Sequence, residues 1–238
     1  MKSIPVLAPS DLDYLPQKCP RCFVLKKKYN IATNSYPPPV FSNFDVIQQQ
    51  YFKYKDLSYV SDDFPNGQIM KQTELPGRII SSILKDNKGR PFQLGGRPDI
   101  VIKFDDTKYG FGIIDFKTTN IDPNKSQKYK FQLEAYAQIF THPGETKKTK
   151  TPKLGPINVM GVLQFFPQEI FSHDRNQCDL QMRMAYSPLQ RDENNFYEHI
   201  TKILDILEAD HLPNFTNECG ECNFYLNQNN IIHELQRK

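Results

Sequence analysis

No stretch of the 238-residue chain is apolar for long enough to cross a bilayer, and the apolar stretch after Met1 is too short for a secretory signal. The sequence also lacks the G-x-G-x-x-G pattern of dinucleotide-binding folds and the G-K-S/T of a phosphate-binding loop. No base partner for a serine or cysteine nucleophile is evident. These absences argue against membrane proteins and the common nucleotide-binding classes, and they predict a cytoplasmic protein.

Neither sign of charge is in large excess, because 30 Lys and Arg residues nearly balance 27 Asp and Glu residues and leave a net charge of +3. This balance permits a nucleic-acid partner without requiring one. Lysines concentrate at 26–28 and between 147 and 153. Solvated loops explain such runs most simply, and phosphate contacts along a DNA path are the functional alternative.

The apolar periodicity predicts one mixed α/β domain over residues 1–238. We expect four strands and three main helices: strands over 92–104, 109–117, 157–166 and 177–186, and helices over 41–55, 125–140 and 191–207. The second strand is apolar up to Asp115, as expected of a central strand that is buried on both faces. The order of elements predicts a mixed central sheet flanked by helices.

The same patterns predict which side chains are buried. Phe44, Ile47, Tyr51 and Tyr54 recur three and four residues apart, which predicts the buried face of the first helix. Cys178 falls on the apolar face of a strand and is expected in the core. The histidines show no paired ligand spacing, so we expect surface or capping roles for all five: His142, His173, His199, His211 and His233.

Two carboxylates and a lysine carry the chemistry that the sequence indicates. Asp99 follows Gly-Gly-Arg-Pro, and Asp115 and Lys117 lie two residues apart at the end of the next strand, so they share one face. Carboxylate oxygens select hard cations such as Mg²⁺ or Mn²⁺, and a neighbouring lysine suits phosphodiester hydrolysis. A solvated Asp–Lys ion pair is the simpler alternative. Gln132 and Tyr136 lie one helical turn apart on one face, where they could contact the DNA backbone or orient the lysine. The simpler alternative is that Tyr136 packs in the core and Gln132 is exposed.

This order of motifs resembles the RecB-like branch of the PD-(D/E)XK nuclease superfamily. The resemblance rests on Gly-Arg-Pro-Asp99, Ile-Ile-Asp115-Phe-Lys117-Thr-Thr and Gln132-x-x-x-Tyr136. It implies metal binding by Asp99, Asp115 and the carbonyl of Phe116, catalysis by Lys117, and support from Gln132 and Tyr136. The family often has a His or Glu on its first helix as a further metal ligand. This chain has none there and offers as substitutes only Asp45, Gln48 and Gln49.

Four of the five cysteines form two C-x-x-C pairs, at Cys19 and Cys22 and at Cys219 and Cys222. Four thiolates bind either one Zn²⁺ ion or a 4Fe–4S cluster, and sequence spacing does not separate the two. Free or redox-paired thiols are the third possibility. Either metal site predicts that the two ends of the chain meet, with residues 1–30 and 208–238 forming a cysteine-ligated cap.

The cysteines extend the resemblance to the iron–sulfur nucleases related to AddB and to the CRISPR-associated RecB-like exonucleases. This likeness favours a 4Fe–4S cluster over zinc, although those relatives usually place one cysteine first and three last. It implies a metal-dependent nuclease acting on single-stranded DNA or DNA ends in repair, recombination or CRISPR adaptation, where protein partners are expected. The alternatives are an inactive nuclease fold that binds DNA or a partner, and a zinc-stapled interaction protein.

Overall fold

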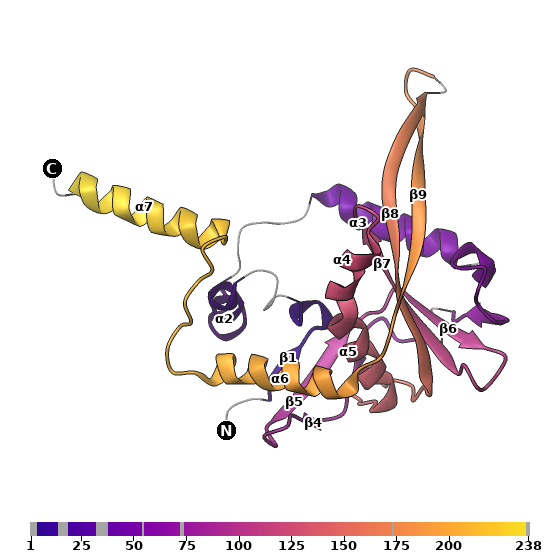
Figure 1. Cartoon of the computed structure of the whole chain (residues 1–238), viewed down its shortest axis with the longest axis horizontal. Coiled ribbons are helices and arrows are strands. Elements are labelled where there is room, and N and C mark those ends of the chain that lie inside the picture. Colours follow the sequence, from indigo (N-terminus) through magenta and orange to yellow (C-terminus); the bar gives the residue numbers. More distant parts are fainter. Residues whose placement is uncertain are drawn as a thin grey trace.

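A mixed five-stranded sheet organises the computed structural model, which describes residues 4–13, 19–31, 38–53, 55–71, 74–172 and 174–236 (Figure 1). The sheet has the order β2-β6-β7-β8-β9, with β2 (Gly67–Ile69), β6 (Ile100–Phe104), β7 (Phe111–Thr118), β8 (Ile157–Ser172) and β9 (Cys178–Leu189). The central pair β7 and β8 is parallel, and the other pairs are antiparallel. The mixed α/β sheet and the central position of β7 are therefore confirmed.

A smaller sheet surrounds β5 (Pro91–Gly96), which pairs with β1 (Val6–Leu7), β3 (Ile79–Ile80) and β4 (Leu84–Lys85). The prediction of one strand over 92–104 is therefore wrong, because β5 and β6 belong to different sheets. The break falls at Arg97-Pro98-Asp99. Pro98 has no N–H to donate to a ladder and a fixed φ, so the chain turns there. The turn places Asp99 directly before β6.

Helices cover both faces of the sheet. The α-helices are α2 (Pro20–Tyr29), α3 (Pro39–Phe52), α4 (Pro123–Ser126), α5 (Lys130–Thr141), α6 (Glu193–Glu208) and α7 (Gly220–Gln236), and the short 3₁₀ helices are η1 (Pro9–Asp11), η2 (Leu57–Tyr59) and η3 (Gln127–Tyr129). The predicted helices over 125–140 and 191–207 are confirmed as α4-η3-α5 and as α6. One core lies between the sheet and the α5–α6 pair, and the second contains the end of α3.

The buried face of α3 differs from the prediction. Phe52 is buried and packs against Phe116 and Phe165 of the sheet, whereas Ile47 is 60% exposed and Tyr51 is 46% exposed. Tyr54 lies outside the described residues. The helix is rotated so that a polar flank with Asp45, Gln48 and Gln49 lies over the end of β7.

The hairpin of β8 and β9 extends well past the end of β7 (Figure 1). We call residues 166–184 the hairpin arm. Among the described strands, none besides β8 and β9 pairs in this arm, because the last β7–β8 partners are Thr118 and Phe165. Cys178 is exposed on this arm, so its predicted place in the core is wrong: the alternation is present, but no layer covers it.

The predicted surface role of His199 also needs correction. His199 is buried, stacks on Phe131 at 4.1 Å between ring centroids, and has its Nε2 2.6 Å from the carbonyl oxygen of Leu12. It is a packed histidine and not a surface one, whereas His173 lies outside the described residues. The C-terminal helix α7 projects from the body in Figure 1.

Candidate active site

Strand pairing brings Asp99 and Asp115 together. Ile100 and Ile114 are direct partners in the antiparallel β6–β7 ladder, so the residues next to them are close. The backbone N–H of Phe116 donates to Asp99 Oδ2 at 2.7 Å. This bond closes the start of β6 onto the end of β7 and fixes the Asp99 carboxylate beside the Asp115 backbone.

Asp115 is 3% exposed, and neighbours hold both of its oxygens. Lys117 Nζ lies 2.5 Å from Asp115 Oδ2, as the two-residue spacing on one strand face predicts. Gln132 Nε2 of α5 donates to Asp115 Oδ1 at 2.8 Å. The predicted ion pair therefore exists, but it is buried against a helix rather than solvated.

Burial and neighbouring negative charge raise the proton affinity of both carboxylates. Burial, followed by the negative charge of Asp115, raises the pKa of Asp99 to about 7. Burial also raises the pKa of Asp115, although Lys117 opposes the change. Burial alone lowers the pKa of Lys117, but the two aspartates outweigh it and raise that pKa. The buried pair therefore carries excess negative charge, and either a proton or a bound cation would neutralise it.

Tyr136 supports the turn that leads into Asp99. Its hydroxyl donates to the carbonyl oxygen of Arg97 at 2.8 Å, and burial raises its pKa, as do the charges of Asp115 and Asp99. This close approach requires glycine at position 96, because an added Cβ would lie 2.8 Å from Pro9 Cδ and 3.1 Å from Tyr136 Cε1.

An open pocket of about 330 Å³ collects these groups. The six residues expected from the sequence all line it: Asp99, Asp115, Phe116, Lys117, Gln132 and Tyr136. Four others complete the lining: Phe41, Asp45, Arg97 and Thr118. The lining is mostly polar and acidic, which suits a hard divalent cation and a phosphate. The structure thus brings the expected residues together.

The side chains that the sequence offers as substitutes for a first-helix metal ligand lie on the polar flank of α3: Asp45, Gln48 and Gln49. Asp45 lines the pocket, and its charge raises the pKa values of Asp99 and Asp115. Gln49 Nε2 donates to Asp99 Oδ1 at 3.0 Å, and Gln48 Nε2 donates to Thr118 Oγ1 at 3.2 Å. Within the described ranges, no three carboxylates converge closely enough to share one ion. Asp45 therefore acts on the pair through its charge at this separation.

Sequence reasoning missed Asp13 and Tyr129. Asp13 Oδ1 is buried without a hydrogen-bond partner in the described structure, and burial raises the Asp13 pKa to about 7 against the attraction of Lys117 and Lys128. The Tyr129 ring centroid lies 4.8 Å from Lys117 Nζ. No spacing rule links residue 13 to residue 117, so only the tertiary structure reveals this electrostatic interaction.

The four cysteines gather at a second site. Cys19 caps α2, and Cys219 directly precedes α7, so each C-x-x-C pair spans the first turn of a helix. All four sulfurs lie within 4.8 Å of one another. Burial and the neighbouring sulfurs raise the pKa values of Cys22 and Cys222, the latter to about 11. The described chain has free thiols here rather than disulfides, so the group suits a thiophilic metal.

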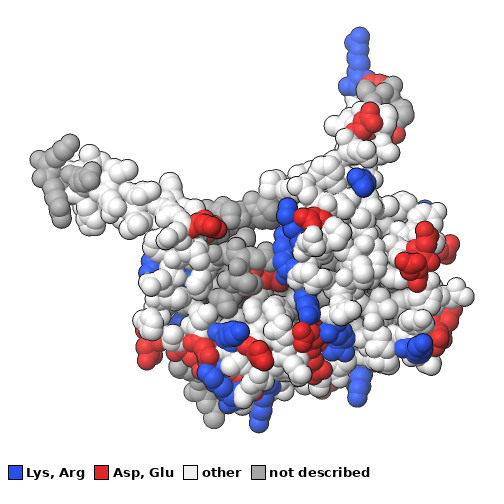
Figure 2. Space-filling view, viewed as in Figure 1, with Lys and Arg blue, Asp and Glu red and all other residues white. Residues whose placement is uncertain are grey.

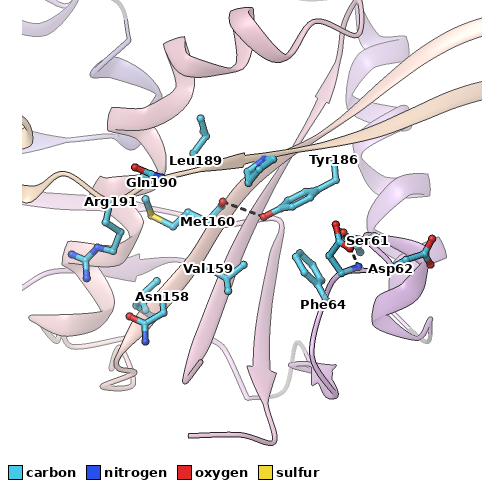
Figure 3. A pocket seen from close by; sticks show the side chains of 14 residues that line it. Ser61, Asp62, Phe64, Asn158, Val159, Met160, Tyr186, Leu189, Gln190 and Arg191 are labelled. Atoms are coloured by element: carbon cyan, nitrogen blue, oxygen red, sulfur yellow. Dashed lines mark hydrogen bonds between the residues drawn. The ribbon is translucent and has the colours of Figure 1, made fainter. Parts of the chain in front are cut away.

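A larger cavity, of about 840 Å³, lies elsewhere and contains none of the expected residues (Figure 3). Tyr186 crosses it and donates to the carbonyl oxygen of Met160 at 3.2 Å. Arg191 lies at its rim, but its guanidinium binds the buried Glu134 at 2.6 Å. The larger cavity is therefore not the better candidate for an active site, and the smaller acidic pocket is preferred.

The structure thus has a buried carboxylate pair with a lysine at the end of a mixed sheet flanked by helices. The family model for the PD-(D/E)XK nuclease superfamily matches residues 44–225, and the chain belongs to this superfamily. Every member of the pocket after Phe41 falls inside the match. Members of this superfamily are usually nucleases, which supports a hydrolase that binds nucleic acid.

Among solved structures, the chain is similar to one described as "Crystal structure of SSO0001", with 15% identity and a TM-score of 0.50. The similarity covers 88% of this chain and 80% of the other, and it concerns the fold alone. No curated protein matches the chain. Among the described residues, no helix is both long and apolar enough to span a membrane.

Proposed function

We propose that the chain is a deoxyribonuclease that depends on Mg²⁺ or Mn²⁺ and hydrolyses phosphodiester bonds at the acidic pocket. One observation carries the proposal: two adjacent buried carboxylates have raised pKa values and share their pocket with Lys117. A structural ion pair needs one carboxylate, not two that repel each other. Such a surplus of negative charge is typical of a site that binds a cation.

In this proposal Asp99 and Asp115 hold the ion, with the Phe116 carbonyl as a further oxygen ligand and Asp45 adding negative charge. A bound divalent ion supplies positive charge that polarises the phosphate and makes a water more acidic. Lys117 carries its charge next to the same site, where it stabilises the negative charge that develops on the phosphate.

Gln132 and Tyr136 act as positioning residues. The Gln132 amide orients Asp115, and the Tyr136 hydroxyl fixes the turn before Asp99. Arg97 lines the same pocket and is placed to pair with a phosphate. Figure 2 shows Lys and Arg side chains in the hollow between the hairpin arm and the C-terminal helix, which suits a nucleic-acid strand approaching the pocket.

The test is cleavage of end-labelled single-stranded and duplex DNA with Mg²⁺ or Mn²⁺. Asp115→Asn removes one charge of the pair with little change of shape, and we expect it to abolish cleavage. Asp105→Asn is the matched control, because Asp105 is exposed in the turn at the opposite end of the β6–β7 hairpin. Equal cleavage by wild type and Asp115→Asn would refute the site.

The resemblance supports a finer proposal, an exonuclease on single-stranded DNA or DNA ends that serves repair, recombination or CRISPR adaptation. Linear and circular forms of one single-stranded DNA separate the modes of action. An exonuclease degrades only the linear form, whereas an endonuclease opens both.

A non-catalytic DNA-binding protein is the second candidate. It is favoured by the observation that Gln49, Phe116, Gln132 and Lys117 already contact all four oxygens of the carboxylate pair. DNA binding without cleavage in either metal would support this candidate and reject the enzyme.

A further inference from the structure

We propose that Cys19, Cys22, Cys219 and Cys222 bind a single tetrahedral metal ion of the zinc type, and not the 4Fe–4S cluster that the family resemblance implies. The inference concerns the cysteine site alone. It stands or falls independently of the nuclease proposal, because it uses no residue of the acidic pocket.

The distances between the sulfurs carry the argument. Cys22 Sγ lies 3.5 Å from Cys222 Sγ and 3.6 Å from Cys219 Sγ, and Cys19 Sγ lies 3.8 Å from Cys222 Sγ. Four thiolates that share one zinc ion at about 2.3 Å form a tetrahedron whose edges are about 3.8 Å long. The three sulfur pairs therefore have nearly the separation that one shared ion requires.

A cubane cluster needs a wider frame. Each of its four thiolates binds a different iron atom, so the sulfurs stand roughly 6 Å apart. All four sulfurs here lie within 4.8 Å of one another, which leaves no room for four irons and four sulfides between them. Thiolate sulfurs can bind either a zinc ion or a 4Fe–4S cluster, but the spacing of these four sulfurs fits only the single ion.

The frame around the sulfurs resists expansion. Cys19 is fully buried and Cys22 is 4% exposed. Between them, Arg21 donates from Nε to the carbonyl oxygen of Pro213 at 3.0 Å, and its guanidinium lies 5.3 Å from the centroid of the Phe215 ring. These contacts hold the segment before Cys219 against α2. A site of cluster size would require α2 and this segment to move apart against these contacts.

The ion has a structural task in this fold. Among the described side chains of α7, only Cys222 is buried, and six large apolar ones are exposed: Phe224, Tyr225, Leu226, Ile231, Ile232 and Leu235. Figure 1 shows α7 leaving the body beside α2. The start of α7 is therefore fixed mainly through its cysteines. Zinc is suited to such a joint because it has no redox chemistry.

The test uses the full chain, purified anaerobically from cells supplied with both iron and zinc. We expect about one zinc per chain, no iron–sulfur absorption in the visible range, and zinc-edge X-ray absorption that reports four sulfur ligands at about 2.3 Å. Exchange with Co²⁺ should give the colour of a tetrahedral thiolate site. Bound iron with labile sulfide would overturn the proposal, and so would a protein that takes up neither Zn²⁺ nor Co²⁺.

Two serine variants make the test specific. Cys219→Ser removes one proposed ligand, and we expect the number of sulfur ligands to fall from four to three. Cys178→Ser is the matched control, because Cys178 is exposed on the hairpin arm. An unchanged sulfur count in Cys219→Ser rejects the assignment. If that variant does not fold, the wild-type measurements still decide between ion and cluster.

Discussion

The charge pair of Asp99 and Asp115 should make the protein less stable as pH rises when no divalent ion is present. The pKa of Asp99 is about 7 in the folded chain and near 3.8 in the unfolded chain. The folded state therefore holds a proton that the unfolded state has released between pH 4 and pH 7. Stability that is present below pH 4 is lost as pH rises through 7. Asp115 adds to the effect in the same direction.

The size of the effect follows from the same numbers. About three pH units at about 1.4 kcal/mol each give at most roughly 4 kcal/mol for Asp99. A bound ion acts oppositely, because it binds the deprotonated pair and stabilises the folded state by about 2.7 kcal/mol at one hundred times its dissociation constant. Mg²⁺ should therefore stabilise the protein more at pH 8 than at pH 5.

The assay is chemical unfolding of wild type and Asp99→Asn at pH 5 and pH 8, in buffer without divalent ions and then with Mg²⁺. Asp99→Asn should show a smaller loss of stability between these pH values and a weaker response to Mg²⁺. The control Asp105→Asn should behave as wild type does. Identical pH slopes for wild type and Asp99→Asn would refute the reasoning, as would wild-type stability that rises with pH.

Three further predictions follow from single contacts. Lys117→Ala should slow cleavage by about 10²–10⁴-fold while DNA binding is retained, measured by single-turnover kinetics and by a binding assay; cleavage within tenfold of wild type would contradict this role. Gly96→Ala should destabilise the fold by about 1–3 kcal/mol, because its Cβ meets the Pro9 ring at 2.8 Å, and an unchanged thermal midpoint would argue against that contact. Glu134→Gln should cost about 1–3 kcal/mol in denaturant unfolding, because it removes the buried carboxylate charge that binds the half-buried Arg191 guanidinium at 2.6 Å, and an unchanged unfolding midpoint would contradict this role.

The sequence was sufficient for the part of the site that depends on neighbouring residues. An apolar run that ends in Asp115 predicts a central strand, and the spacing of Asp115 and Lys117 places them on one face. The structure agrees on both points. Gln132 and Tyr136 also reach the pocket as helical spacing suggests.

The contribution of α3 was only partly accessible from the sequence. Absence of the expected His or Glu left Asp45 and its neighbours as substitutes, but apolar spacing placed Ile47 and Tyr51 inward. The sheet reverses that choice, since Phe52 fills the space next to Phe116 and turns Asp45 toward the pocket. The amphipathic pattern predicts that a helix forms, whereas the surface of the sheet on which the helix packs decides how it is rotated about its axis.

The sequence by itself determined the strand that carries Asp115, the Asp–Lys spacing and the two cysteine pairs, because these follow from residue identity and from periods of two and 3.6 residues. Only the tertiary structure decided that the charges of Asp13 and Lys117 interact, that Cys178 is exposed on a hairpin arm, and that four sulfurs lie within 4.8 Å. The physical reason is range: local periodicity orders side chains along one element, whereas burial, charge coupling and metal geometry depend on distances between elements that the chain brings together only when it folds.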